Sequence, residues 1–142
     1  MEKCHFHKDT IKFLGYIIFP KGIQLDQEKL TAIANWQTPT SLKSLQRFLG
    51  FTNFYRKFIN HYSTIVQPLT RLTGKQKYVW DSKAEQAFHY LKDKFTTAPI
   101  LRLPDPDLPY TLEVDASNVG IGAILLQPGK ENALLHPIAY YS

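Results

Sequence analysis

The spacing of apolar residues changes twice along this chain, from a strand pattern to a helix pattern and back again. In the first 25 residues, apolar side chains form short runs bounded by turn residues, which is typical of strands. From about residue 26 to residue 97 they recur every three or four positions, which is typical of amphipathic helices. After Tyr110 the strand pattern returns. The sequence therefore predicts an α+β fold in which a helical bundle lies between two strand-forming segments.

The N-terminal segment contains three short strand-like pieces. Cys4–His7 alternates, and Ile11–Leu14 and Tyr16–Phe19 follow it. The sequence Pro20-Lys21-Gly22 is expected to end the last of these strands. Two or three strands of this length need a covering layer to be stable, so we expect the helices that follow to supply it.

Four helices are predicted in the middle of the chain: Asp26–Trp36, Leu42–Ile59, Thr64–Leu72 and Ser82–Thr97. Asp26 is expected to cap the first of them, and Asp81 or Ser82 the fourth. Several short helices joined by short links favour a small bundle. The second helix has the clearest pattern, with an apolar face made of Leu42, Leu45, Phe48, Leu49, Tyr55 and Ile59.

The C-terminal segment is expected to form the opening of an antiparallel sheet. It begins with four prolines between residues 99 and 109, which disfavour a helix. Strands are predicted at Tyr110–Ala116, Gly120–Gln127 and His136–Tyr141, with a turn around residues 128–132. The sequence ends before any helix that could cover this sheet, so we expect its apolar face to be open.

Composition excludes several classes of protein. The chain has 142 residues, of which 44% are hydrophobic, so it is long enough for one domain or two small ones and is not wholly disordered. One cysteine excludes an intramolecular disulfide framework and fits a reducing compartment. No apolar run approaches the ~20 residues of a membrane helix, and no secretory signal follows Met1. We therefore expect an intracellular protein without a membrane partner.

The charge is distributed unevenly. Residues 1–103 contain 16 Lys and Arg against 7 Asp and Glu, whereas residues 104–142 contain 1 against 5. From Lys29 to Trp80 there are eight basic residues and no acidic one. A basic stretch of this length is typical of a surface that binds a polyanion such as nucleic acid. A solvated helical surface is the alternative on charge alone.

Twelve short blocks, in order along the full length, resemble the middle of the pol polyprotein of long-terminal-repeat retrotransposons of the Ty3/gypsy type, and more distantly of retroviruses. No single block is specific, but their order is. The blocks are Lys3-Cys4-x-Phe6, Phe13-Leu14-Gly15, Gly22-Ile23, Trp36-x-x-Pro39, Phe48-Leu49-Gly50-Phe51, Tyr55-Arg56-Lys57-Phe58-Ile59, Pro68-Leu69, Ala98-Pro99-Ile100-Leu101, Pro104-Asp105, Val114-Asp115-Ala116-Ser117, Gly120-x-Gly122-Ala123 and His136-Pro137-Ile138-Ala139-Tyr140.

The resemblance implies a domain layout. Residues 1–25 would be the C-terminal end of the reverse transcriptase palm, residues 26–98 the thumb and a connecting helix, and residues 99–142 the incomplete N-terminal part of a ribonuclease H domain. The family's Tyr-x-Asp-Asp polymerase motif would lie before residue 1. The implied partners are an RNA–DNA hybrid, the template–primer duplex and the rest of the pol polyprotein. The implied location is a cytoplasmic virus-like particle or the vicinity of the nucleus.

Asp115 is the residue with the strongest chemical implication. The Val-Asp-Ala-Ser block resembles the one that carries the family's first metal-binding Asp, so Asp115 would be both catalytic and a metal ligand. Ribonuclease H chemistry uses two divalent ions about 4 Å apart, and Mg²⁺, or Mn²⁺ in its place, requires several carboxylates. The partner ligands would lie after residue 142, so we expect this fragment alone to bind no metal and to be inactive. The alternative is a degenerate, ribonuclease-like connection domain.

The second predicted helix carries a polar stripe opposite its apolar face. Retroviral thumbs place a similar line of polar, glycine and aromatic residues in the minor groove of the template–primer, and glycine there lets a backbone approach the duplex. Basic residues beside the line can contact phosphates without reading the sequence. The alternative is that Gly50 is a packing contact and Phe54 a core residue. The candidate nucleic-acid-binding residues are Lys43, Gln46, Arg47, Gly50, Phe54 and Lys57.

The segment Phe13-Leu14-Gly15-Tyr16 lies where the family has its primer grip, a hairpin that holds the primer end. A buried strand is the competing interpretation of this short apolar block. For the whole chain, the resemblance predicts a fragment of an RNA-directed DNA polymerase with ribonuclease H activity, which positions the template–primer and supplies one carboxylate. A non-catalytic nucleic-acid-binding module and an inert remnant of a decayed element remain as alternatives.

Overall fold

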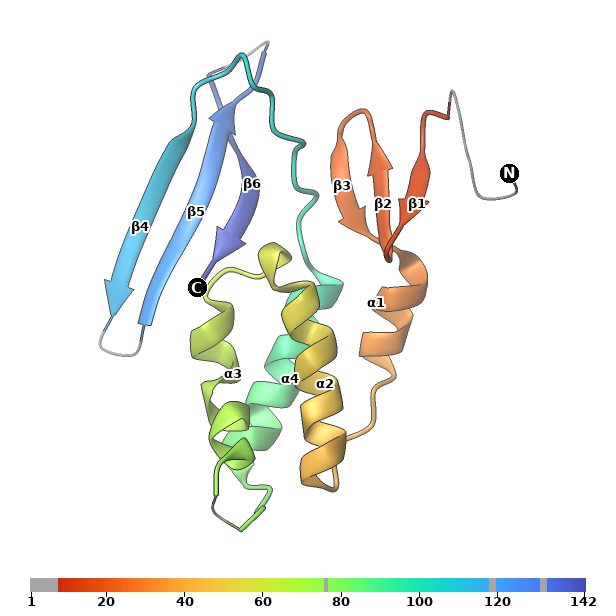
Figure 1. Cartoon of the computed structure of the whole chain (residues 1–142), viewed down its shortest axis with the longest axis vertical. Helices are drawn as coiled ribbons and strands as arrows, with labels where there is room; N and C mark the ends of the chain where they lie inside the picture. The colour runs from red at the N-terminus through yellow and green to blue at the C-terminus, as the bar shows by residue number, and fades with distance from the viewer. Residues whose placement is uncertain (1–7, 76, 118–119, 131–132) are drawn as a thin grey trace.

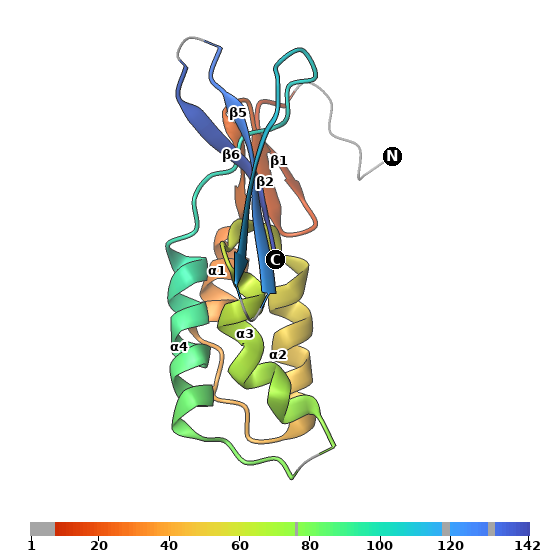
Figure 2. The same cartoon turned by 90° about the vertical axis from the view of Figure 1, so that its left-hand side faces the viewer.

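The computed structural model describes residues 8–75, 77–117, 120–130 and 133–142. Two three-stranded antiparallel sheets lie side by side at one end of the molecule, and the helices gather at the other (Figure 1). The view from the side shows the same division between strands and helices (Figure 2). The structure is therefore α+β, with the predicted order of strands, helices and strands.

The first sheet is a meander of β1 (Ile11–Phe13), β2 (Tyr16–Phe19) and β3 (Gly22–Leu25). The strand Tyr16–Phe19 ends before Pro20 as expected, but it is not the last of this segment, because Gly22 pairs with Phe19 and begins a third strand. Proline is suited to such a two-residue turn. The strand predicted at Cys4–His7 lies outside the described residues.

The helical layer consists of α1 (Gln27–Ala34), α2 (Leu42–Phe54), α3 (Tyr62–Thr70) and α4 (Ser82–Thr96). Short 3₁₀ turns η1 (Arg56–Phe58) and η2 (Arg71–Thr73) follow α2 and α3. The predicted caps form, since Asp26 accepts a hydrogen bond from the amide of Glu28 and Asp81 accepts one from that of Ala84. The apolar faces meet in one core, which includes the fully buried side chains of Ile33, Leu45, Phe48, Leu69, Phe88, Leu91 and Phe95.

Helix α2 ends five residues earlier than the sequence pattern predicts. The pattern continues to Ile59, but the backbone leaves the helix at Tyr55. The buried hydroxyl groups of Thr52 and Tyr62 lie 2.9 Å apart, so the chain must reverse between them. The aromatic and β-branched residues of the last turn are also poor helix formers. Similarly, α1 ends at Ala34 rather than at Trp36, with Asn35 as its C-cap.

The second sheet consists of β4 (Thr111–Ser117), β5 (Gly120–Pro128) and β6 (Leu135–Tyr141), in that spatial order. Antiparallel register pairs Val114 with Ala123 and Leu112 with Leu125, so these residues share one face. The side chains of Leu112, Val114 and Ile121 on this face are 61% to 63% exposed. The expected open apolar face is therefore present.

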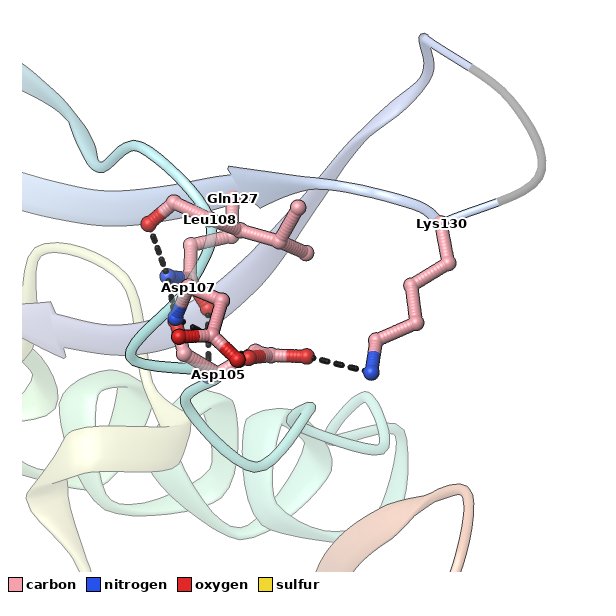
Figure 3. A network of polar contacts seen from close by, with 5 residues as sticks. All are labelled: Asp105, Asp107, Leu108, Gln127 and Lys130. Atoms are coloured by element: carbon pink, nitrogen blue, oxygen red, sulfur yellow. Dashed lines mark hydrogen bonds and ion pairs between the residues drawn. The ribbon is translucent and has the colours of Figure 1, made fainter.

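The connection between α4 and β4 is bonded to both sheets. Leu101 is buried and exchanges backbone hydrogen bonds of 2.7 and 2.9 Å with Ile23 of β3, while the amide of Arg102 donates to the carbonyl of Pro137 in β6. Further along, the buried amide of Gln127 binds the backbone of Asp105 and Leu108 (Figure 3). The proline-rich connection is thus an ordered strap rather than a free linker.

Candidate nucleic-acid interface

The outer face of α2 presents the predicted polar stripe. Ser41 starts the helix with a capping box made with Ser44. The apolar face, with Leu45 and Phe48, is turned into the core, so the opposite face is left to solvent. The predicted binding residues on the helix are all exposed: Lys43, Gln46, Arg47, Gly50 and Phe54.

Gly50 lies in open space at the middle of this stripe. A Cβ atom placed there would meet no other group within 4 Å. A glycine that serves helix packing has a neighbouring element close to its Cα atom, and no such neighbour is present among the described residues. The alternative interpretation of Gly50 as a packing contact is therefore not supported.

A hollow of about 490 Å³ runs between α2 and α3 beside Gly50. Its lining includes groups that can donate or accept hydrogen bonds, and Arg56 supplies a positive charge. The α3 side was missed from the sequence, although Ser63 and Gln67 are four residues apart, which is the spacing of one helix face. The polar residues around the hollow are Asn53, Arg56, Ser63, Gln67 and Thr70.

Lys57 does not continue the helical stripe, because α2 has already ended and Lys57 lies on η1. Its ammonium nitrogen is 4.2 Å from the centroid of the Tyr16 ring and 5.5 Å from that of Phe58. Partial burial lowers the pKa of Lys57 from its ordinary value. The structure thus directs this lysine toward the N-terminal hairpin, where its charge lies over an aromatic face.

The hairpin Phe13–Tyr16 presents two apolar side chains to solvent at its tip. Phe13 is 57% and Leu14 61% exposed, so the competing interpretation of this block as a buried strand is wrong for these two residues. Phe13 pairs with Tyr16, which leaves Leu14 and Gly15 as the turn. Both turn residues have positive φ angles, 50° and 80°, which is the geometry of a tight type I′ hairpin.

The hairpin and the end of α2 form one continuous surface. The Tyr16 ring stacks on Phe54 with centroids 6.0 Å apart, and the Tyr16 hydroxyl donates to the Phe54 carbonyl. Phe54 remains 54% exposed, so it is a surface aromatic and not a core residue. Two segments that the sequence treats separately, the predicted primer grip and the helical stripe, are therefore neighbours.

Asp115 lies on β4, exposed to solvent and opposite Gly122 of β5. A Cβ atom on Gly122 would be 3.2 Å from the His61 ring, so the start of α3 lies beside this part of the sheet. Glu113 is on the same face as Asp115, one pair of residues along. Among the residues that the structure describes, no group of three or more His, Cys, Asp or Glu is placed to hold a metal ion. The described carboxylates therefore do not complete a divalent-metal site.

Comparison with known proteins gives the relationship. Over 100% of its length, the chain is 40% identical to the retrovirus-related Pol polyproteins of transposons opus and 297 from Drosophila melanogaster. It is 37% identical over 99% of its length to the Tf2-3 polyprotein of Schizosaccharomyces pombe. This chain is a relative of retrotransposon Pol polyproteins. The resemblance inferred from the twelve sequence blocks is confirmed.

The Pol relatives are much longer than this chain, which spans 10% to 15% of their length. Residues 80–142 match the family described as an RNase H-like domain found in reverse transcriptase. This match includes α4 as well as the second sheet. No helix in the described parts of the chain has both the length and the apolar character needed to cross a membrane.

Solved structures of retroviral Pol proteins have the same fold. The foamy viral protease–reverse transcriptase in complex with an RNA/DNA hybrid matches with a TM-score of 0.80 and 27% identity, over 98% of this chain and 19% of that one. The same protein in complex with double-stranded DNA matches with a TM-score of 0.79 and 28% identity, over 94% and 28% respectively. The α+β fold expected from the sequence is confirmed.

Proposed function

We propose that this chain is the thumb-to-ribonuclease H segment of a retrotransposon reverse transcriptase, and that it holds the template–primer duplex between the two active sites. In this layout residues 1–25 end the palm, residues 26–98 form the thumb and connecting helix, and residues 99–142 begin the ribonuclease H domain. The open space at Gly50, in the middle of an exposed polar stripe, is the observation that carries this proposal.

The stripe has the chemistry that a wide, shallow minor groove requires. At Gly50 the helix backbone can approach the duplex, Gln46 can donate to or accept from sugars and base edges, and Phe54 can pack on sugars. Lys43 and Arg47 can contact phosphates on either side without reading the sequence. The related foamy viral protein is solved in complex with an RNA/DNA hybrid and with double-stranded DNA, which supports a duplex as the ligand.

The hairpin tip is proposed to hold the primer end. Phe13 and Leu14 are exposed apolar groups on a tight turn, and Tyr16 joins this turn to Phe54 of the stripe. A leucine in the left-handed region is rare, and strained backbone of this kind gathers at functional sites. We therefore assign the tip, including Gly15, to the same ligand as α2.

Asp115 is proposed as one carboxylate of a ribonuclease H site that other parts of the longer protein complete. It is exposed on a sheet and free of ion pairs among the described residues, as an incomplete ligand set would be. Mg²⁺ or Mn²⁺ held there would activate water for cleavage of the RNA strand. The proposed location of the parent protein is intracellular, in a virus-like particle or near the nucleus.

The test of the duplex-binding role is Gly50→Val in the reverse transcriptase that carries this segment. The valine should hold the helix away from the groove, so the Kd for template–primer should rise about 10-fold or more, as for loss of one or two close contacts. Because nothing lies within 4 Å of this position and glycine is a poor helix former, the melting temperature should stay equal or rise.

The matched control is Ala32→Val, which adds a similar branched side chain to an exposed position of α1. It should leave the Kd for template–primer within twofold. Unfolding of the Gly50→Val protein would show that Gly50 is needed for packing. If Gly50→Val and Ala32→Val bind template–primer with the same Kd, the duplex does not lie on this face of α2.

A further inference from the structure

We propose that Tyr55 is a positioning residue whose hydroxyl holds the hairpin tip in its left-handed turn, so that the tip and the α2 stripe present themselves to the duplex as one unit. This inference rests on the proposed function, since it concerns how two parts of the same binding surface are joined. Tyr55 itself touches no ligand in this scheme.

The hairpin tip needs support because of its backbone conformation. Leu14 has a φ angle of 50°, in a region that residues with a Cβ atom rarely occupy. A two-residue turn with positive φ at both positions is ordinarily built from Asn and Gly. Here the second position is Gly15 but the first is a leucine, so contacts from elsewhere must favour this turn over its alternatives.

Two hydrogen bonds provide this support from behind the tip. The Tyr55 hydroxyl donates to the carbonyl of Leu14 at 3.3 Å, and the amide of Asp26 donates to the carbonyl of Gly15 at 2.9 Å. The side chain of Leu14 itself remains exposed. Both carbonyls of the turn are thus held, one by α2 and one by the cap of α1.

Gly15 is fitted to the Tyr55 hydroxyl. A Cβ atom at this position would lie 2.3 Å from the Tyr55 oxygen and 2.9 Å from the Cε of Lys29. Gly15 also has a φ angle of 80°, which glycine alone adopts readily. The absence of a side chain at the tip therefore serves the approach of Tyr55 as well as the turn.

Tyr55 connects this support to the stripe. It is the C-cap of α2 and only 4% exposed. Its ring centroid is 4.9 Å from that of Phe54 and 5.4 Å from that of Tyr16, with edge-on geometry in both pairs. Burial raises the pKa of the Tyr55 hydroxyl, so it remains a donor at neutral pH. The Tyr55 side chain therefore contacts Phe54 at the end of the stripe as well as Leu14 and Tyr16 of the hairpin.

The experiment compares Tyr55→Phe with Tyr78→Phe. Both changes remove one hydroxyl that donates to a backbone carbonyl, because Tyr78 donates to Pro39 at 2.7 Å. Tyr78 lies in the α3–α4 connection and has no contact with the hairpin or the stripe among the interactions described. Each variant retains its aromatic ring, so both should fold, and their melting temperatures should fall by similar amounts.

Two readouts separate positioning from general stability. In the reverse transcriptase, Tyr55→Phe should slow single-turnover extension of a bound primer about 2- to 10-fold, the equivalent of one hydrogen bond, with less than a twofold change in the Kd for template–primer. In the 142-residue chain, the Asp26 amide should exchange hydrogen about 3-fold faster or more, because the tip that it binds is loosened. Tyr78→Phe should change neither quantity.

The inference requires that Tyr55→Phe both slows primer extension and speeds exchange at the Asp26 amide. Either change without the other overturns the inference, and so does the same result for Tyr55→Phe and Tyr78→Phe. Its failure is distinct from failure of the proposed function. If Gly50→Val weakens duplex binding while Tyr55→Phe matches Tyr78→Phe, the duplex still lies on α2 and only the positioning role is lost. If Gly50→Val has no effect, the proposed function itself is wrong.

Discussion

The helical bundle and the second sheet bury their apolar residues to very different extents. In the bundle, Leu91 of α4 is completely buried and belongs to a core that four helices and β3 share. In the sheet, Leu112 and Val114 of β4 are more than 60% exposed. Both segments have strong patterns in the sequence, so the difference is one of covering layers and not of composition.

The difference shows which part of the chain can hold a shape without help. A three-stranded sheet with one open apolar face is marginal in water, whereas the bundle is closed on itself. In the proposed function, the bundle can therefore present a fixed binding face, whereas Asp115 lies on a sheet that needs a covering layer. The predictions below test this division, from the largest expected effect to the smallest.

The largest effect is expected from Asp115→Asn in the reverse transcriptase that carries this segment. The substitution keeps the shape of the side chain but removes a charge from the proposed metal site. Cleavage of the RNA strand should fall more than about 100-fold, since even residues behind metal ligands cost 10- to 100-fold. DNA synthesis should stay within twofold, because the bundle is unaltered.

The control for this change is Glu113→Gln, on the same face of β4. It should leave both activities close to those of the unmodified enzyme. If folded Asp115→Asn protein loses DNA synthesis and RNA cleavage equally, Asp115 on the sheet does not act in cleavage alone, and the proposed division of roles between bundle and sheet is wrong. The 142-residue chain alone should cleave no labelled hybrid in the presence of Mg²⁺.

The next effect is a contrast in stability between two leucines. Leu91→Ala should destabilise the chain by about 2–5 kcal/mol, because it leaves a cavity in a closed core. Leu112→Ala should cost less than about 0.5 kcal/mol, as for other exposed positions. Urea unfolding of the two variants measures this. A large loss for Leu112→Ala would show that the open face of the sheet is covered in solution.

A smaller effect is expected on the salt dependence of duplex binding. Lys43→Ala and Arg47→Ala on the bundle should each lower the slope of log K against log salt by about one at most. Lys130→Ala provides the control, since this lysine of the sheet segment is already paired with Asp105 at 2.7 Å. The slopes are obtained by measuring duplex binding at several salt concentrations between low and physiological values. Unchanged slopes for Lys43 and Arg47 would mean that the stripe is a solvated face.

The smallest effect concerns two carboxylates whose pKa values are both lowered. At Asp81 the causes are the hydrogen bond from the Ala84 amide and the neighbouring Arg71, and at Asp105 the bonds from Lys130 and the Asp107 amide. A carboxyl group whose pKa is lowered in the folded state stabilises the fold at pH values above its ordinary pKa of 3.8. This stabilisation is lost as the pH falls through the lower pKa of the folded state.

Because Asp81 caps a bundle helix and Asp105 only fastens the strap, the two groups should act differently in acid. Asp81→Asn should lower the melting temperature at neutral pH, and this difference should shrink as the pH falls below 3.8, measured by thermal unfolding. Asp105→Asn should leave the melting temperature of the bundle unchanged at every pH. A pH-dependent effect of equal size from Asp105→Asn would place the strap within the cooperative unit.

Much of the fold was accessible from local sequence patterns. The caps at Asp26 and Asp81 and the tail strands were predicted, because hydrogen-bonding side chains and alternation are local signals. The early end of α2 was not, since it depends on a contact between Thr52 and Tyr62 that only the folded chain makes. The third strand of the first sheet was missed because Pro20-Lys21 resembles a stop as much as a turn.

The candidate site followed the same rule. Exposure of Lys43, Gln46 and Arg47 follows from helix periodicity alone. The neighbouring wall with Ser63 and Gln67 needed the packing of α3 on α2, and the bond from Tyr55 to Leu14 joins residues 41 positions apart. Sequence patterns identify which side chains face solvent, whereas the surfaces that two elements build together require the structure.

The strap between α4 and β4 sets limits on how this segment can evolve. Leu101 binds β3 while the next residue binds β6, and a Cβ atom on Gly22 would lie 2.3 Å from the Leu101 carbonyl. An insertion of one residue before Leu101 would turn its side chain out of the core and break its pairing with Ile23. An insertion near Asp107, on the exposed turn, would alter neither pairing. Length variation among functional descendants of this chain should therefore gather after residue 105 and avoid residues 99–102.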